Sequence, residues 1–365
     1  MEPNHDRELD QRKQRILQAI VQDYVATAEP VGSQVLVERY VLGVKSATIR
    51  NEMAEMSERG YLRQPHTSAG RIPSNLGYRF FVSRLMILPV VDEAETVRIE
   101  RAISSAASEL EAILRRTCLL LAKMTRLPAV AVPPSADDTE LRQVFLSAAG
   151  ADKALLVFLL STGHTEHRIL VDTHITASDA LLLANALNDR LNGTSLATLR
   201  SLSEEGGAGT LDLPPELHTL ANVWHRVISE AISLAHSLVQ DAPIYVEGTE
   251  SVLEQPEFRD VDRLSQFLTL IQHRAAVLDA LGRAMHTIEV VPPPRTVQVV
   301  IGEETVHPQM SEYSLVSSTY YVGIRERGTI GVLGPTRMDY ARATAAVELM
   351  ARTMSDILTR LSFAS

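Results

Sequence analysis

Apolar residues recur every three or four positions along the first part of the chain, which is the spacing of an amphipathic helix. Pro30 and Gly60 interrupt the pattern, and Ser33 is suited to cap the helix that follows Pro30. The predicted helices span residues 9–28, 33–40 and 46–59. Two extended segments, 61–64 and 70–72, then flank a loop that contains Pro, Ser and Gly, which predicts a small β-hairpin.

Three short helices followed by a hairpin form the order of elements in a winged helix-turn-helix, which is a DNA-binding fold. In that fold the third helix presents its N-terminal residues to the major groove. Here Ile49, Met53 and Met56 face inward at helical spacing. The side chains that then turn outward are Ser46, Thr48, Arg50, Asn51 and Glu55. A small helical bundle that binds no nucleic acid is the alternative that this topology leaves open.

The outward residues are of types that contact DNA. Arginine can read guanine, and asparagine adenine, with two hydrogen bonds, which makes Arg50 and Asn51 candidates for base contacts. Lysine and hydroxyl side chains at a helix start suit phosphate contacts, and the hairpin would bring basic side chains to a neighbouring backbone or groove. The predicted DNA-binding residues are Lys45, Ser46, Thr48, Arg50, Asn51, Arg63, His66 and Arg71.

The remainder of the chain alternates between strand and helix patterns. A continuous apolar stripe over residues 92–124 predicts one long helix that would couple the DNA-binding end to the rest. Strands are predicted over residues 141–148, 152–160, 167–172, 244–247, 296–301, 314–322 and 329–333. Further helices are predicted over residues 178–191, 215–240, 261–285 and 339–361. Strands, a helical block and strands again indicate an α+β fold with a helical insertion.

Charge is distributed unevenly along the 365 residues. The net charge is −10, yet residues 39–86 carry eight basic and three acidic side chains, whereas 23 basic and 35 acidic side chains follow. A basic module on an acidic body fits a nucleic-acid-binding protein that attaches through one face, although a merely uneven surface gives the same count. The polar first residues, and apolar runs far shorter than the roughly 20 residues of a membrane helix, predict a cytoplasmic protein with no membrane segment.

Longer motifs resemble a known family. The segments PVGSQVL, KSATIRNEMAEMSERGYL and HTSAGRIPSNLGYRFFV, together with IGVLGPTRMDYARA much later in the chain, resemble the HrcA family of heat-inducible transcription repressors. The recognition-helix motif is matched by Ser46, Ala47, Thr48, Ile49, Arg50, Asn51 and Glu52. The wing and C-terminal motifs are matched by His66, Ser68, Gly70, Arg71, Pro73, Gly334, Pro335, Arg337, Met338 and Tyr340. Gln34, Ser83 and Thr305 depart from the residues usual in the family.

The resemblance implies an N-terminal winged helix-turn-helix and a central and C-terminal GAF-like α+β domain with an inserted helical dimerisation domain. The implied domains are residues 1–88 (DNA binding), 89–175 (first GAF-like part with the coupling helix), 176–250 (inserted dimerisation domain) and 251–365 (second GAF-like part). The implied partners are a double-stranded inverted-repeat operator near chaperone genes, a second copy of the chain, and the chaperonin GroEL as modulator. We expect dimer contacts at Leu187, Leu220, Trp224 and Val227.

Other candidate chemistry is weak. His164 and His167 lie in a predicted turn, and two histidines without a clear third ligand do not make a metal site. Cys118, the only cysteine, falls in a helix as a small core residue. Arg337 follows a strand at a helix start, where it would bind an anion or, as we expect, make a structural or interdomain contact. No nucleophile-and-base set, phosphate loop or dinucleotide motif is found, so we expect neither catalysis nor a cofactor.

Two further functions stay open from the sequence alone. A repressor controlled by a small molecule in the GAF-like domain is one, because such domains often bind ligands in other proteins. An enzyme that uses the central α+β domain and is regulated by the winged helix is the other. The sequence offers no clear polar cluster for a ligand and no catalytic set, so a repressor that senses heat and unfolded protein is the favoured hypothesis.

Overall fold

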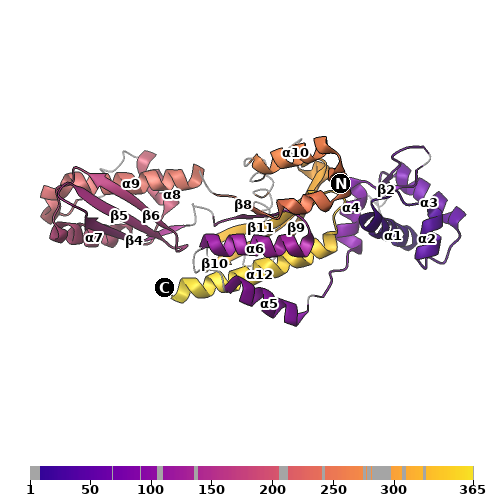
Figure 1. The fold of residues 1–365 in the computed structure, drawn as a ribbon, viewed down its shortest axis with the longest axis horizontal. Coiled ribbons are helices and arrows are strands. Elements are labelled where there is room, and N and C mark those ends of the chain that lie inside the picture. Colours follow the sequence, from indigo (N-terminus) through magenta and orange to yellow (C-terminus); the bar gives the residue numbers. More distant parts are fainter. Residues whose placement is uncertain are drawn as a thin grey trace, which may run out of the picture.

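The computed structural model describes the chain over most of its length. The described residues are 9–67, 69–90, 92–104, 110–134, 139–204, 213–240, 243–273, 277, 281, 297–305, 310–323 and 326–364. The molecule is elongated, with an N-terminal unit at one end, a central body, and a separate sheet with its own helices at the other end (Figure 1). This mixture of helices and sheets agrees with the predicted α+β class. Ser68 of the wing motif lies outside the described residues, as does most of the predicted helix beyond residue 273.

Three helices begin the N-terminal unit, as predicted. They are α1 (Gln11–Thr27), α2 (Ser33–Arg39) and α3 (Ser46–Glu58). Their apolar stripes meet in one core, in which Ile16, Leu36 and Ile49 are fully buried. The side chain of Asp10 caps α1 by accepting a hydrogen bond from the backbone N–H of Lys13 at 2.9 Å.

Ser33 does not cap α2, contrary to the prediction. The N-cap is Gly32, whose backbone is extended, and Ser33 is the first helical residue. The hydroxyl of Ser33 lies 2.9 Å from the hydroxyl of Ser46, the first residue of α3. This hydrogen bond ties the starts of the two helices together, so Ser33 stabilises their mutual placement and not the end of one of them.

The predicted hairpin follows α3. Its antiparallel strands are β1 (Leu62–Arg63) and β2 (Ile72–Pro73), and the chain continues into α4 (Asn75–Phe80) and a π-helical turn, Phe81–Leu85. Ser74 caps α4 by accepting from the N–H of Gly77 at 3.1 Å. Gly77 is required there because a Cβ atom would lie 2.2 Å from the carbonyl oxygen of Tyr61.

The central body is built on a five-stranded sheet in the order β8-β3-β11-β10-β9, in which each pair of neighbouring strands is antiparallel. In chain order the strands are β3 (Ala129–Val132), β8 (Tyr245–Glu247), β9 (Gln298–Ile301), β10 (Tyr313–Val322) and β11 (Glu326–Pro335). The surrounding helices are α6 (Leu110–Thr125), α10 (Val261–Gln272), α12 (Tyr340–Ala364) and two 3-10 helices, Thr249–Glu254 and Pro256–Arg259.

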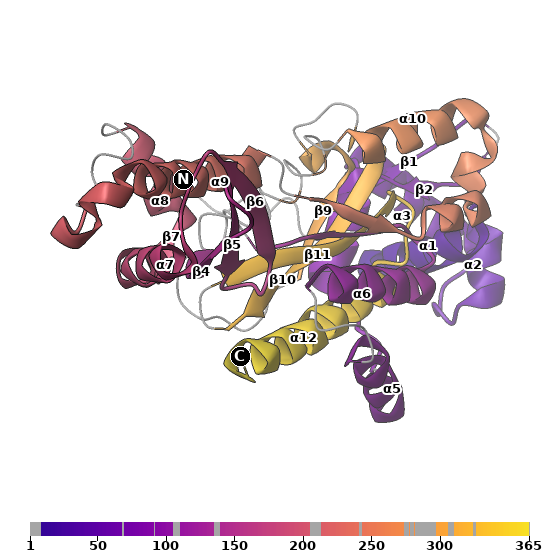
Figure 2. The same cartoon turned by 60° about the vertical axis from the view of Figure 1, so that its left-hand side comes forward.

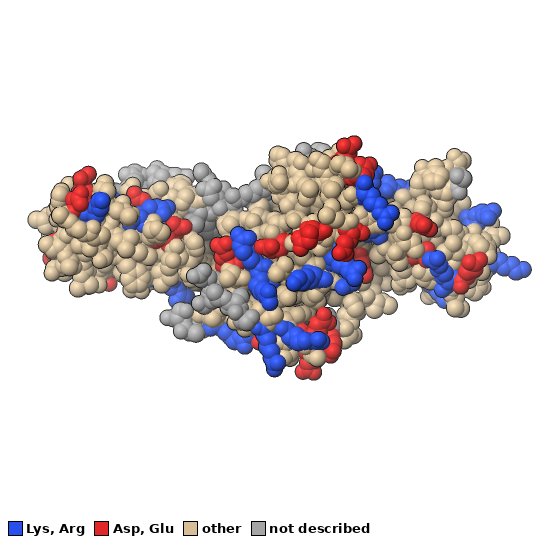
Figure 3. All heavy atoms as spheres, viewed as in Figure 1, with Lys and Arg blue, Asp and Glu red and all other residues tan. Residues whose placement is uncertain are grey.

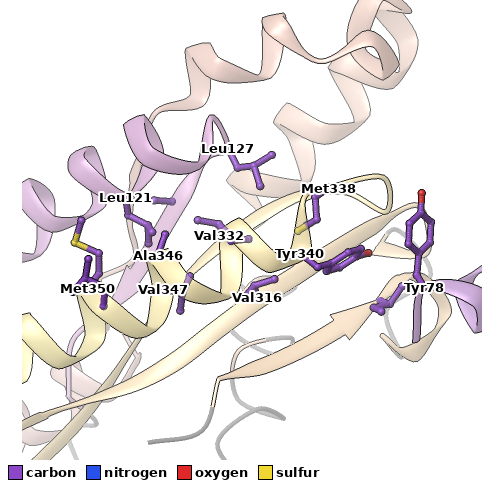
Figure 4. Packing of buried hydrophobic residues seen from close by; sticks show 14 of the residues in the cluster. Tyr78, Leu121, Leu127, Val316, Val332, Met338, Tyr340, Ala346, Val347 and Met350 are labelled. Carbon is purple, nitrogen blue, oxygen red and sulfur yellow. The ribbon is translucent and has the colours of Figure 1, made fainter. Parts of the chain in front are cut away.

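Both faces of this sheet are covered, which explains why its strands are apolar at consecutive positions. Val316 and Val332 pack with α6 and α12 in one core (Figure 4). Leu315 and Leu333, each one position away, belong to a second core on the opposite face with Phe267 of α10. Adjacent residues of one strand therefore pack into different cores, because successive side chains of a strand point to opposite faces of the sheet.

The apolar stripe over residues 92–124 forms two helices and not the single helix predicted. They are α5 (Glu93–Ser104) and α6, separated by residues outside the described part. Helix α5 packs against both α6 and α12 and does not continue along the axis of α6 (Figures 1 and 2). No proline or glycine interrupts residues 104–110, so the sequence carries no signal for the break.

A separate unit, here called the inserted unit (residues 139–204 and 213–240), interrupts the central body. Its antiparallel sheet has the order β6-β5-β4-β7. Its elements are β4 (Glu140–Ala148), β5 (Lys153–Leu160), β6 (Thr165–Val171), α7 (Ala177–Leu191), β7 (Thr194–Ser195), α8 (Leu196–Glu204), a 3-10 helix (Pro215–Leu220) and α9 (Ala221–Gln240). The chain leaves after β3 and returns in β8, which pairs with β3. The unit is thus inserted between two neighbouring strands.

The domain boundary expected at residue 175 divides this unit. Strands β4, β5 and β6, expected in the central domain, share a sheet with β7 and a hydrophobic core with α7 and α9. Alternating apolar residues predict that a strand exists, but they do not predict which sheet it joins. The structure therefore corrects the expectation of a purely helical insertion.

The residues expected at the dimer contact lie in the core of the inserted unit. Leu187, Trp224 and Val227 have 0% exposed surface, and Leu220 packs against the same core. The guanidinium of Arg190 covers the Trp224 ring at 5.4 Å from its centroid. Leu187, Trp224 and Val227 have no surface left for a second chain, so the expectation is wrong for these three residues, which hold the unit together instead. Leu220 is only partly buried, and its dimer contact stays a prediction.

Candidate nucleic-acid interface

Helix α3 is fixed in the N-terminal unit by its apolar face. Ile49, Met53 and Met56 are buried against α1 and α2, as the spacing predicts. Arg50 and Asn51 lie on the opposite, exposed side. The arrangement agrees with the predicted orientation, in which one face of α3 packs and the other is presented to the outside.

Two of the three acidic residues of α3, Glu52 and Glu55, form ion pairs with basic residues of α1. Glu52 forms ion pairs with Arg12 at 3.3 Å and with Lys13 at 2.9 Å. Glu55 lies 3.1 Å from the Lys13 ammonium and 3.6 Å from Arg59. Hydrogen bonds to Asp10, then to Glu52, raise the pKa of Lys13 against the opposing effect of its burial. The negative charge of α3 is therefore compensated on the side that faces α1.

The basic and amide side chains on the outer side of α3 have no such partners. Within the described part of the chain, Lys45, Arg50 and Asn51 make no side-chain hydrogen bond or ion pair, and all three are exposed. Lysine and arginine side chains project from this outer end of the molecule (Figure 3). Unpaired basic groups beside an amide form a surface suited to phosphates and base edges.

The start of α3 differs from the prediction at two positions, Ser46 and Thr48. Lys45 is the N-cap residue, no side chain caps the helix, and the first turn holds no acidic residue. This start leaves backbone N–H groups and a positive dipole end, which suit a phosphate. The Ser46 hydroxyl, expected to face outward, is half-buried and bonded to Ser33, while Thr48 is half-buried. Ser46 therefore positions the helix start through its side chain.

The hairpin loop is closed by its own side chains and tied to the helices. The amide of Gln64 donates to the carbonyls of Thr67 and Ala69 at 2.9 and 3.0 Å. The backbones of Val31 and Arg71 exchange two hydrogen bonds of 2.9 Å. His66 is exposed and Arg71 half-buried. These contacts fix the hairpin beside the α1–α2 connection.

Gly70 makes this close approach possible. A Cβ atom at that position would lie 2.4 Å from the backbone carbon and oxygen of Val31 and 2.8 Å from the carbonyl of Pro30. Only a residue without a side chain fits. The glycine of the wing motif is thus explained by backbone packing.

Arg63 has a different environment from the other predicted DNA-binding residues. Its exposed side chain lines a cleft between the N-terminal unit and the central body, together with Tyr24, Tyr78 and Arg263. The sequence could not separate Arg63 from Arg71, because the direction of each side chain depends on how the unit docks on the body.

That docking is made by the C-terminal motif, whose role the sequence left open. Arg337, which is 8% exposed, donates to both carboxylate oxygens of Glu257, to Gln255, and to the backbone carbonyl of Val25 in α1. The interdomain contact expected for Arg337 is confirmed. Because its donors are satisfied within the protein, Arg337 acts as a structural anchor.

Two further contacts join the units. Arg79 of α4 pairs with Glu304 and donates to the carbonyl of Val299 at 2.5 Å. The rings of Tyr78 and Tyr340 lie 5.6 Å apart between centroids (Figure 4). An aromatic contact and two charged anchors therefore connect the DNA-binding candidate to the body.

A known family matches this chain. The family model described as the HrcA protein C terminal domain matches residues 111–344, which cover the inserted unit and most of the central body. The chain belongs to the HrcA family. Two relatives named heat-inducible transcription repressor HrcA, from Desulforamulus reducens and Moorella thermoacetica, are each 36% identical over 97% of this chain, and the matches cover 98% and 99% of the relatives.

A third relative with the same name, from Symbiobacterium thermophilum, is 35% identical over 96% of this chain and 98% of its own length. A crystal structure described only as a hypothetical protein matches 97% of this chain and 100% of its own with a TM-score of 0.58 and 20% identity, which supports the fold alone. HrcA proteins are thus named as transcription repressors, which is not a class of enzymes. The family resemblance inferred from the motifs is confirmed.

The remaining candidates are ordinary structural residues. His164 lies 3.1 Å from the carboxylate of Glu166, and no three metal-ligating side chains gather anywhere in the described ranges. Cys118 is buried in the central body as predicted, and burial raises the pKa of its thiol. No helix in the part of the chain that the structure describes is long and apolar enough to span a bilayer.

Proposed function

We propose that the N-terminal unit is a winged helix-turn-helix and that the chain is an operator-binding transcription repressor. The observation that carries the proposal is the division of charge on α3. Glu52 and Glu55 are paired on the α1 side, whereas Arg50 and Asn51 are exposed and unpartnered among the described residues. The names of the relatives, transcription repressors over nearly the whole chain length, support the same conclusion.

In this proposal Arg50 and Asn51 read bases in the major groove. Lys45 and the uncapped start of α3 hold a phosphate, and His66 and Arg71 of the hairpin approach the neighbouring backbone or groove. Ser46 and Thr48 contribute through the helix start that they help to build. Binding weakens steeply with salt because phosphate contacts release counterions.

We propose that two copies bind an inverted repeat, and that the inserted unit joins them. Helices α7 and α9 cover one side of its sheet (Figure 2). Apolar side chains on the other side of the sheet are exposed. Phe145, Leu155, Ile169 and Val171 are 47, 37, 65 and 46% exposed. Leu155 and Ile169 are direct cross-strand neighbours, so the residues form one patch of the kind that marks a protein interface. We therefore place the dimer interface on this face of the sheet and not at the buried residues expected from the sequence.

The central five-stranded sheet with its helices corresponds, in this proposal, to the GAF-like domain that the resemblance implies. The proposed repressor acts on chaperone operons in the cytoplasm. Heat removes its activity, and the chaperonin GroEL restores it, as the family resemblance implies. The word heat-inducible in the relatives' name supports the heat response.

Selection from a pool of randomised DNA duplexes tests operator binding and requires no candidate operator sequence. The full chain, immobilised through one end, should enrich an inverted repeat with two equivalent half-sites. A parallel selection with the Arg50→Ala chain should enrich the repeat more weakly and lose the preference at one base pair of each half-site. Enrichment of no sequence by the unaltered chain, or the same preference at every base pair by both chains, would contradict the assignment of α3.

A further inference from the structure

A polar cleft of about 320 Å³ lies between the N-terminal unit and the central body. Its walls come from segments far apart in the sequence: Tyr24 of α1, Arg63 of β1, Tyr78 of α4, Arg263 of α10 and Glu303 of the short helix Gly302–Glu304. The volume is at the lower end of the range of small-molecule sites, which is roughly 300–1,000 Å³. The cleft is separate from the outer side of α3.

The charges around the cleft balance. Three arginines and three glutamates line it, and the buried Arg337–Glu257 pair is satisfied within the protein. Arg263 and Glu312 approach each other only to 4.0 Å. Arg63 and Glu303 have no ion-pair partner among the residues that the structure describes. A single unpaired cation and a single unpaired anion thus border one small space.

A buried hydroxyl group on the cleft wall is also unsatisfied. Tyr78 is 2% exposed, and its hydroxyl has no hydrogen-bond partner in the described structure. The hydroxyl points away from the Tyr340 ring (Figure 4). Buried hydroxyl groups nearly always have a partner, because leaving one unpaired costs the free energy of its lost hydration. A bound polar molecule would supply that partner.

We propose that this cleft binds a small zwitterion, the chemical class of the free amino acids. Arg63 would bind its carboxylate, Glu303 its ammonium group, and the Tyr78 hydroxyl a further polar atom. A simple anion or cation is disfavoured because either would leave one of the two charged side chains without a counterpart. The ligand contacts both units, so its binding would be coupled to the placement of the DNA-binding unit.

Calorimetric titration of the DNA-free full chain tests the site independently of the proposed repressor function. The probes are the free L-amino acids, each titrated to about 5 mM, a range that detects millimolar dissociation constants. We expect at least one to bind. Its N-acetyl derivative, which lacks the ammonium group, and its amide, which lacks the carboxylate, should each bind about tenfold more weakly or worse. Failure of every amino acid to bind, or equal binding of either derivative, would overturn the proposal.

Variants locate the site. Arg63→Gln and Glu303→Gln should each weaken binding by about tenfold or more, and Tyr78→Phe by a few-fold, with unchanged circular dichroism spectra. Arg115→Gln is the matched control, because this exposed arginine pairs with Glu111 and Glu247, and none of the three lines the cleft. Binding that is unaffected by both Arg63→Gln and Glu303→Gln would place the ligand elsewhere and contradict the assignment.

Discussion

Basic side chains have two different roles at the two sides of the N-terminal unit. Where the unit meets the body, Arg79 and Arg337 are paired with carboxylates and backbone carbonyls. On the outer side, Arg50 and Lys45 have no partner among the described residues. Paired arginines hold the structure, and unpaired ones remain available for a ligand of opposite charge. The apolar side chains of the inserted unit also have two roles. Trp224 is buried and stabilises the core, whereas Ile169 is exposed on the sheet and is available for a contact with a second chain.

Trp224→Ala should have the largest effect. The ring is fully buried, and its removal leaves a cavity in the core of the inserted unit, at a cost of about 3–5 kcal/mol in the free energy of unfolding. Unfolding by denaturant measures this loss in the free energy of unfolding. Leu181→Ala on the exposed side of α7 is the control and should change little. A Trp224→Ala chain of normal stability but impaired dimerisation would restore the sequence-based assignment.

Arg337→Ala should come next, at about 3 kcal/mol, because it leaves Glu257 without its partner and removes the link to Val25. The midpoint of thermal unfolding should fall. Protease should also cut more readily between the N-terminal unit and the body. The exposed arginine Arg263 provides the control, since Arg263→Ala breaks only a contact of 4.0 Å. Equal effects of the two substitutions would contradict the anchor role of Arg337.

Much of the N-terminal unit could be predicted from the sequence because its signals are local. Ile49, Met53 and Met56 fix the buried face of α3 through their spacing alone, and Gly60 marks its end. The start and end of α3 agree with the prediction to within one residue. The outward direction of Arg50 and Asn51 follows from the same periodicity.

The rest depends on contacts between distant segments. Trp224 has the pattern of an apolar helix face whether a neighbouring sheet or a second chain covers it, so the sequence could not decide between core and interface. The short strand Ala129–Val132 is not predicted because four apolar residues carry no clear period. Arg337 is identified by its motif, but its partners Glu257 and Val25 lie 80 and 312 positions away.

Arg50→Ala should weaken binding to the selected duplex by about 1–3 kcal/mol, or roughly 5- to 150-fold, and relax the preference at one base pair. Fluorescence anisotropy measures the affinity. Arg115→Ala removes the same charge from an exposed site in the body and should leave the affinity unchanged. Loss of affinity that is equal for the selected and a scrambled duplex would assign Arg50 to phosphate and not base contact.

Ile169→Asp should raise the dimer dissociation constant by about tenfold or more, because it places a charge in the proposed apolar interface. Sedimentation analysis over a concentration series measures the change. Leu182→Asp introduces the same charge at a similarly exposed site on α7, 57% exposed, and should leave the dimer intact. A dimer that resists the first substitution and not the second would move the interface to α7.

Arg79→Ala should have the smallest effect on stability, about 1 kcal/mol or less, because both members of the Arg79–Glu304 pair are about one-third exposed and solvent screens them. Thermal unfolding at low and high salt checks this. The small destabilisation should shrink further as salt is added. A loss as large as that of Arg337→Ala would show that the two junction arginines are equivalent.

The most direct test of the central claim is fluorescence anisotropy with a labelled inverted-repeat duplex and a scrambled duplex, at several salt concentrations and with and without chaperonin. The account predicts tight binding to the repeat alone, a steep loss of affinity with salt, and tighter binding when chaperonin is present. Equal, weak binding of both duplexes under every condition would contradict it, because the unpaired side chains on the outer side of α3 would then recognise no specific DNA sequence.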